Sequence, residues 1–237
     1  DLALAVSWWR KAAEAGHADA MHNLACSYSK GEGVAKDWAL AASWWRKAAE
    51  AGHTDAMFGL GCSYDDGEGV AEDRALAASW WRKAAEAGHT DAMHNLAWSY
   101  RKGEGVAEDL ALAVSWWRKA AEAGNTDAMF GLACSYGDGE GVAQDWALAA
   151  SWWRKAAEAG HTDAMHNLAC SYRKGEGVAK DWALAASWLQ KAAEAGQSGA
   201  MHNLARAYST GEGVAKDLAL AVSWWRKAAE AGHTDAM

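Results

Sequence analysis

Proline is absent from the 237 residues, although hydrophobic residues make up 51% of the chain and many of them are alanine. Proline breaks the interior of a helix, whereas alanine is the residue that favours it most. A chain that avoids the first and is rich in the second is typical of an all-α protein. We therefore expect helices throughout the sequence.

Long apolar runs are missing as well. The apolar stretches are short and broken by Arg, Lys, Asp or Glu, whereas a membrane-spanning helix needs about 20 apolar residues in succession. We expect no membrane insertion. No signal peptide is recognisable. Since the sequence has no initiator Met, opens at an expected helix start and stops where another helix should begin, we interpret it as an excerpt or a trimmed form of a longer protein.

Positive charge is in deficit. The 23 Lys and Arg residues stand against 31 Asp and Glu, for a formal net charge of −8 and a pI near 5.6. Nucleic-acid binding selects strongly basic faces, so we expect no nucleic acid among the partners. A moderate negative charge suits a soluble protein whose copies repel one another weakly.

Cysteine is scarce, and all four copies share one position of a repeat: Cys26, Cys62, Cys134 and Cys170. Neighbouring cysteines therefore lie at least one repeat apart. Packed helices are about 8–10 Å apart, beyond the ~4.4–6.8 Å that a disulfide allows between Cα atoms. We predict free thiols, which favour a reducing compartment only weakly, so the localisation stays open.

The repeat itself is the strongest feature present. The string Lys-Ala-Ala-Glu-Ala-Gly occurs seven times, always 36 residues apart, beginning at Lys11, Lys47, Lys83, Lys119, Lys155, Lys191 and Lys227. Such a fixed period is typical of a solenoid, in which each unit buries its apolar face against its neighbours. We predict one solenoid over residues 1–237, with units starting at positions 1, 37, 73, 109, 145, 181 and 217 and the last unit truncated.

Residues 37–72 illustrate one unit. Asp37 is a good N-cap for a helix over 38–51, which ends at Gly52. Thr54 is the expected N-cap of a second helix, which runs to Gly67. Two such helices joined by short turns form an αα-hairpin.

Within the first helix of this unit, a buried stripe is expected from apolar residues at helical spacing. They are Leu40, Ala41, Trp44 and Ala48. Trp44 has a Trp counterpart in all seven copies, so we expect it to be the large buried ring. The small residue at Gly61 in the second helix should let two helices approach closely.

About a dozen positions recur in every unit and carry a resemblance to a known family. In one copy they are Ala56, Leu60, Gly61, Tyr64, Gly67, Gly69, Val70 and Asp73, then Ala77, Trp80, Trp81, Lys83, Ala84, Ala85 and Gly88. Along its whole length the chain resembles the Sel1-like repeat (SLR), a relative of the tetratricopeptide repeat. The resemblance implies a right-handed superhelix of hairpins that scaffolds protein complexes. A secreted branch of that family has two cysteines per repeat, whereas this chain has at most one, which speaks against that branch's extracellular context.

The second helix of each unit carries the positions that differ most between units. The positions equivalent to Phe58, Cys62, Asp65 and Asp66 are spaced i, i+4, i+7 and i+8, so they form one stripe, called here the variable stripe. It is either a solvated face under little constraint or the concave, partner-binding face of the solenoid. The candidate partner-binding residues are His22, Phe58, His94, Trp98, Arg101, Phe130, His166, Arg173 and Arg206. Trp98 is the strongest anchor among them, unless it only fills a local gap.

The variation alternates. Units with His at the first stripe position end the helix in Lys, whereas units with Phe there end it in Asp, so the stripe repeats every 72 residues in the first five units. We expect the row Lys30, Asp66, Lys102, Asp138 and Lys174 to place opposite charges side by side across the stack.

Several constellations are set aside. His22 with Cys26 and His166 with Cys170 have i, i+4 spacing that could hold part of a metal site, but zinc needs about four ligands and other units break the pair. Ser, His and Asp recur at equivalent positions and so give no single oriented triad. We expect no metal, no cofactor and no enzymatic activity. A row of glutamates, one per turn, either attracts a basic partner or merely aids solubility; the second interpretation is preferred.

Two functions from different classes follow from these features. The preferred one is a scaffold that binds a protein or peptide along the concave variable stripe. The alternative is a structural array, recently amplified or engineered, with no evolved ligand, since the units are nearly identical. An enzyme built on such a scaffold is a third and more distant possibility. The identity of the partner and the oligomeric state stay open.

Overall fold

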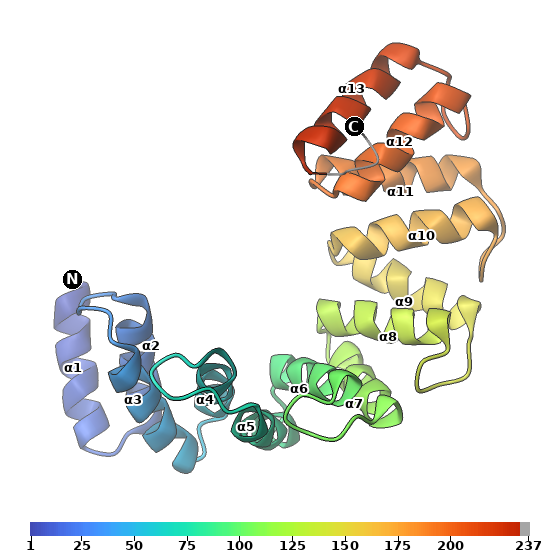
Figure 1. Cartoon of the computed structure of the whole chain (residues 1–237). Coiled ribbons are helices and arrows are strands. Elements are labelled where there is room, and N and C mark those ends of the chain that lie inside the picture. Colours follow the sequence, from blue (N-terminus) through green and yellow to red (C-terminus); the bar gives the residue numbers. More distant parts are fainter. Residues whose placement is uncertain (233–237) are drawn as a thin grey trace. The chain divides into compact units, whose positions relative to one another are not determined.

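The protein is described by a computed structural model that places residues 1–232. In this range the chain forms helices of 13 residues each and no strand, which confirms the expected all-α repeat solenoid. The helices are α1 (Leu2–Glu14), α2 (Ala18–Lys30), α3 (Trp38–Glu50), α4 (Thr54–Asp66), α5 (Arg74–Glu86), α6 (Thr90–Lys102), α7 (Leu110–Glu122), α8 (Thr126–Asp138), α9 (Trp146–Glu158), α10 (Thr162–Lys174), α11 (Trp182–Glu194), α12 (Ser198–Thr210) and α13 (Leu218–Glu230) (Figure 1).

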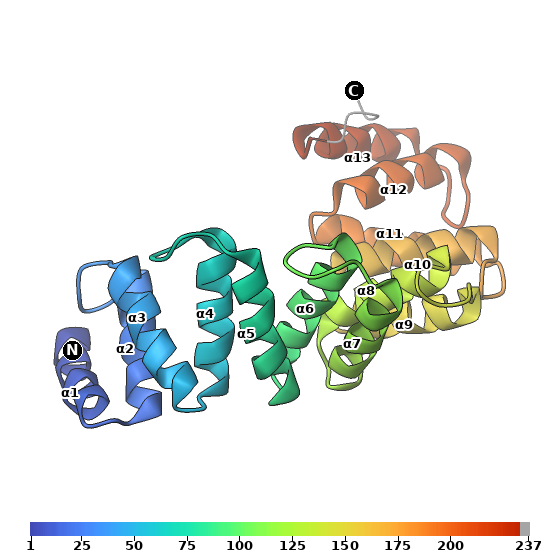
Figure 2. The same ribbon diagram turned by 60° about the horizontal axis from the view of Figure 1, so that its bottom comes forward.

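The helices group into two compact units, Asp1–Ala123 and Gly124–Met237. Inside each unit, every helix packs against the helix that follows it along the chain, as the ribbon shows from two directions (Figure 1 and Figure 2). Neighbouring contact is the packing that a solenoid requires, because each hairpin has only the next one to cover its apolar face. The single solenoid over residues 1–237 stays a prediction.

Odd-numbered helices begin and end as the sequence predicts. The carboxylate of Asp37 accepts a hydrogen bond from the backbone N–H of Leu40 (2.9 Å) at the start of α3. The helix is followed by Gly52 in the left-handed region, at φ +91°. Even-numbered helices end on another left-handed glycine, for example Gly67 at φ +71° after α4.

The start of the even-numbered helices corrects the prediction. The N-cap of α4 is His53 and not Thr54, because the imidazole Nδ1 of His53 accepts a hydrogen bond from the N–H of Ala56 (3.2 Å). Thr54 is already the first helical residue. Asn125 and Gln197, which replace this histidine in two repeats, supply an acceptor oxygen to the same place in α8 and α12. A side-chain acceptor at this position thus caps α4, α6, α8, α10 and α12, whereas His17 at the start of α2 forms no such hydrogen bond. His233, the last copy, lies outside the described residues.

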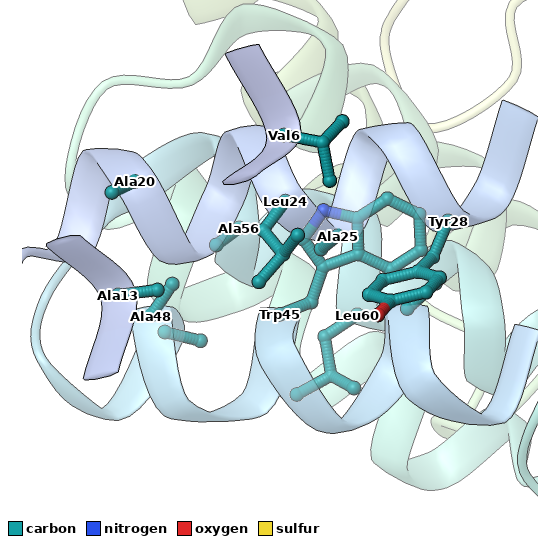
Figure 3. Close-up of a cluster of buried hydrophobic side chains, with 12 residues drawn as sticks. Val6, Ala13, Ala20, Leu24, Ala25, Tyr28, Trp45, Ala48, Ala56 and Leu60 are labelled. Atoms are coloured by element: carbon teal, nitrogen blue, oxygen red, sulfur yellow. The ribbon is translucent and has the colours of Figure 1, made fainter. Parts of the chain in front are cut away.

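The core is a row of alanines, leucines and tryptophans between consecutive helices. In the first cluster, Leu24 and Leu60 are fully buried around Trp45, which is 8% exposed (Figure 3). The turn glycine Gly69 also packs closely, since a Cβ there would overlap the backbone carbonyl of Trp38.

The buried stripe of α3 lies one residue away from its predicted centre. Ala41 and Ala48 are buried as expected, but the buried ring is Trp45, whereas Trp44 is half-buried and Leu40 is 41% exposed. Ala41, Trp45 and Ala48 follow one another at i, i+4 and i+7 and so share a face. The ring of Trp44 lies off that face, with the ammonium of Lys47 4.1 Å from its centroid.

Candidate partner-binding site

Shallow hollows lie between successive even-numbered helices, on the side of the variable stripe. In the unit Asp1–Ala123 two of them are described. The first hollow, of about 300 Å³, is lined by His22, Cys26, Trp38, Trp45, Asp55, Phe58, Gly59, Cys62, Ser63 and Glu68. The second hollow, of about 190 Å³, is lined by Asp65, Trp81, Asn95, Trp98, Ser99, Lys102 and Glu104.

The unit Gly124–Met237 contains two hollows of the same kind. The third hollow, of about 290 Å³, is lined by Cys134, Asp138, Trp146, Trp153, Asn167, Cys170, Ser171, Lys174 and Glu176. The fourth hollow, of about 350 Å³, is lined by Arg173, Lys174, Trp182, Arg206, Thr210 and Glu212. The four hollows therefore repeat one design with different side chains.

Equivalent residues build each hollow. Its walls come from two even-numbered helices and its floor from the odd-numbered helix between them, where Trp45, Trp81 and Trp153 occupy the same repeat position. A glutamate from the turn after the second wall lies at the rim in all four: Glu68, Glu104, Glu176 and Glu212. The prediction named the walls but missed this floor and rim. The recurring second Trp of each pair and the glutamate row were the signals that could have found them.

The capping histidines join one repeat to the next at the wall of the hollows. The ring of His53 stacks on His22 with centroids 4.5 Å apart and an interplanar angle of 11°. Phe58 stacks on His89, and Phe130 on His161, at the same 4.5 Å. The first stripe residue of a repeat thus has one face covered by the helix cap of the following repeat.

His22, the first residue of the variable stripe, is half-buried. Burial lowers its pKa, and the neighbouring His53 lowers it further. Its Nε2 lies 3.4 Å from the thiol sulfur of Cys26. The imidazole of His22 is therefore neutral at pH 7, and the first hollow gains no positive charge from it.

Trp98 partly fills the second hollow. Its ring meets Trp117 edge to face with centroids 5.5 Å apart and an interplanar angle of 85°, and His94 lies at its edge, 6.4 Å away. The guanidinium of Arg101 lies 5.1 Å from the Trp98 ring. Trp98 is half-buried, so packing against Trp117 leaves part of the residue on the surface.

The remaining candidates lie in the C-terminal unit. Arg173 and Arg206 line the fourth hollow together. The imidazole Nε2 of His166 lies 2.7 Å from the amide nitrogen of Asn203 on the next even-numbered helix. Phe130 packs against the capping ring of His161. The structure therefore places His22 with Phe58 in the first hollow, Trp98 in the second and Arg173 with Arg206 in the fourth, whereas His94, Arg101, Phe130 and His166 are not among the lining residues of the four hollows.

The expected charge row does not form ion pairs. Among the residues placed by the structure, no ion pair joins Asp66 to Lys30 or Lys102, nor Asp138 to Lys174. Lys102 lies 5.4 Å from the Trp98 ring, and Lys174 pairs with Glu176 at 3.3 Å. Both lysines instead contact a side chain that lines the same hollow as they do.

The cysteines are free thiols, as predicted. Cys26 and Cys62 line the first hollow, and Cys134 and Cys170 line the third. Burial raises the pKa of Cys26 and Cys170, and raises that of Cys62 from 9.0 to about 11. Within residues 1–232, no group of three or more His, Cys, Asp and Glu is arranged to hold a metal ion.

The raised pKa leads to a prediction for thiol reactivity. In a chain that keeps only Cys62, alkylation by iodoacetamide at pH 8 should be about 100-fold slower than in the unfolded chain, because only the thiolate reacts. The rate should rise with pH until about pH 11, the pKa of the folded thiol. Mass spectrometry of the labelled chain measures both rates. Equal rates in the folded and the urea-unfolded chain at pH 8 would contradict the prediction.

The fold and the row of hollows define a class of protein: an α-solenoid of helical hairpins with a recurring surface site. The Sel1 repeat model matches residues 1–17, 18–53, 54–89, 90–125, 126–161, 162–197 and 198–233. The chain belongs to the Sel1 repeat family. Proteins of this family are generally protein-interaction scaffolds and typically not enzymes. Within residues 1–232, no helix has both the length and the apolar character that crossing a membrane requires.

Solved structures support the same assignment. The chain is similar to c5321, described as a protective antigen present in uropathogenic Escherichia coli strains and displaying an SLR fold, with 36% identity, a TM-score of 0.94 and coverage of 98% of this chain. This chain spans 50% of that protein. A Sel1 repeat protein from Oxalobacter formigenes has 30% identity and a TM-score of 0.82, with 96% of each chain covered. The immunity protein Pa5087 from Pseudomonas aeruginosa, at 22% identity and a TM-score of 0.53, covers 93% of this chain and 84% of its own and shares the fold. No curated protein matches the sequence.

Proposed function

We propose that this chain is a non-enzymatic scaffold that binds a protein or peptide along the face of its even-numbered helices. One observation carries the proposal: hollows recur at equivalent places in successive repeats, while their linings differ in chemistry. The first is aromatic with two thiols, whereas the fourth presents two arginines. Hollows at equivalent repeat positions that differ in their lining residues suit an extended ligand that places a different side chain in each hollow.

The residue types support this role. Aromatic and arginine side chains contribute most of the binding energy in protein interfaces, especially where they are partly enclosed. Phe58, Trp98 and Phe130 are all half-buried, so each combines a fixed position with an accessible ring surface. The rim glutamates favour a protein partner over nucleic acid, since a carboxylate repels phosphate.

The test compares partner capture by two variants, each of which has three apolar residues replaced by serine. Replacement of Phe58, Trp98 and Phe130 by serine should abolish the capture of a partner in an affinity pulldown from the source cells, because the anchors of the stripe are lost. The matched control replaces Leu40, Leu76 and Leu148, which are 41–42% exposed on odd-numbered helices, by serine. That control should keep the partner.

Circular dichroism confirms that both variants are folded before the pulldown is interpreted. If the wild-type chain and the stripe variant capture the same proteins, the scaffold proposal is wrong. The near identity of the units would then favour the alternative, a structural array without an evolved ligand.

A further inference from the structure

The first hollow differs from the others in the charge of its lining. It contains two carboxylates, Asp55 and Glu68, and neither Lys nor Arg. Each of the other three hollows includes at least one cation from the chain itself. They are Lys102 in the second hollow, Lys174 in the third, and Arg173, Lys174 and Arg206 in the fourth.

At two of these hollows the rim glutamate forms an ion pair with a cation of the chain itself. At the second hollow, the guanidinium Nη1 of Arg74 lies 3.5 Å from the carboxylate of Glu104. At the third hollow, the ammonium of Lys174 lies 3.3 Å from Glu176. In both cases a cation of the chain lies against a partly exposed carboxylate.

The first hollow lacks both of these cations. The position of Arg74 is taken by Trp38, and the position of Lys102 and Lys174 is taken by Asp66. In the part of the chain that the structure describes, the carboxylate of Glu68 forms no ion pair. The other acid, Asp55, lies 3.7 Å from the capping imidazole of His89. Glu68 thus has neither of the cations that pair with Glu104 and Glu176, and Trp38 stands at the Arg74 position, as Trp146 and Trp182 do in the third and fourth hollows.

The aromatic lining of the first hollow suits a cation. Trp38, Trp45 and Phe58 line it together, and rings of this kind attract ammonium and guanidinium groups over their faces. The Trp38 ring can hold a cation, since the ammonium of the exposed Lys36, which is not among the residues that line the hollow, lies 4.7 Å from its centroid. The neutral imidazole of His22, whose pKa is lowered by burial, adds no repulsion.

We propose that the first hollow binds the guanidinium of an arginine in the partner protein, held between the Trp38 ring and the Glu68 carboxylate. This inference rests on the proposed scaffold function and names the chemistry of one contact. Arginine fits better than lysine because its planar group stacks on a ring while donating two parallel hydrogen bonds to a carboxylate. In another repeat Arg74 stands at the position of Trp38, and its guanidinium lies 3.5 Å from the rim carboxylate of Glu104.

The probe is Nα-acetyl-arginine N-methylamide, with the citrulline compound as its neutral counterpart of the same shape. The indole N–H signals of Trp38 and Trp45 in an NMR titration report on the hollow, and Trp38→Leu identifies the first of them. Leu110 occupies the equivalent position in another repeat, so the fold accepts leucine there. We expect the arginine compound to bind about tenfold more tightly than the citrulline compound, since a charge-assisted hydrogen bond is lost in the latter.

Three variants locate the contact. Glu68→Gln should weaken arginine binding by about tenfold, for the same reason. Trp38→Arg should abolish it, because the new guanidinium supplies Glu68 with the internal cation that Glu104 has in Arg74. Glu104→Gln is the matched control and should leave the affinity unchanged.

Equal binding of the arginine and citrulline compounds overturns the inference, as does a Glu68→Gln chain that keeps its affinity for arginine. Both results are independent of the pulldown. A chain that captures its partner through Phe58, Trp98 and Phe130 but shows no preference for arginine refutes this inference alone. A chain that binds the probe at the first hollow but captures no partner refutes the scaffold function alone.

Discussion

Trp81→Ala is expected to lower the free energy of unfolding by about 3–5 kcal/mol, the usual loss for removing a large aromatic ring from a core. Trp81 is 5% exposed and forms the floor between α4 and α6. The packing around it is tight: a Cβ added to Gly61 would lie 2.5 Å from Cδ1 of the Trp81 ring. As expected, the small residue lets two helices approach. Guanidinium denaturation followed by circular dichroism measures the change.

The neighbouring Trp80 is the control for this substitution. It is half-buried, and the ammonium of Lys83 lies 3.9 Å from its ring. Trp80→Ala should cost about 1–2 kcal/mol, because less apolar area leaves water in the folded state. The loss of unfolding free energy for Trp81→Leu should lie between the losses for Trp80→Ala and Trp81→Ala. Leu189 occupies the same position in one repeat and is 5% exposed there. A larger loss for Trp80→Ala than for Trp81→Ala would show that the core is on the other face of the helix.

Gly69→Ala is expected to be the second most damaging change, with a loss of more than about 3 kcal/mol. Two effects add. The residue has φ +75°, a conformation that alanine adopts only with strain, and its new Cβ would overlap the carbonyl oxygen of Trp38. Both partners of this clash are backbone, so no side-chain rotation relieves it. The midpoint of guanidinium denaturation measures the loss.

Gly52 separates the two effects. It also has a positive φ, +91°, but an added Cβ would have no heavy atom within 4 Å. Gly52→Ala should therefore show only the backbone strain of about 1–2 kcal/mol. If both substitutions reduce stability equally, the close approach of the turn to Trp38 does not contribute.

The helical hairpins could be predicted from the sequence because their signals are local. Asp37 and Gly52 mark the ends of one helix by their own chemistry, and the structure uses both. The cap of the following helix was misassigned because His53 and Thr54 can both accept a hydrogen bond from a backbone N–H. The backbone decides between them: His53 is extended, at φ −73° and ψ 113°, as an N-cap must be.

The buried tryptophan was a harder problem. Trp44 and Trp45 are adjacent, and adjacent residues of a helix point about 100° apart, so either could belong to an apolar stripe. The choice depends on where the neighbouring helices lie, which is a property of packing between elements. The lining of the hollows likewise depends on how the helices and turns pack against one another. Variation between repeats identified Phe58 as a wall, but the floor from Trp45 and the rim from Glu68 belong to other elements.

The first and third hollows lie at equivalent repeat positions, which has a consequence for the gain or loss of repeats. They lie three repeats apart, while the stripe alternates every two. The helices that form the first hollow therefore carry His22 and then Phe58, whereas those that form the third carry Phe130 and then His166. Loss or gain of one 36-residue unit would keep the repeat in register yet exchange the His and Phe positions of the variable stripe in the units that follow. Recombination between repeats would thus change the order of side chains along the variable stripe while keeping the 36-residue period of the fold.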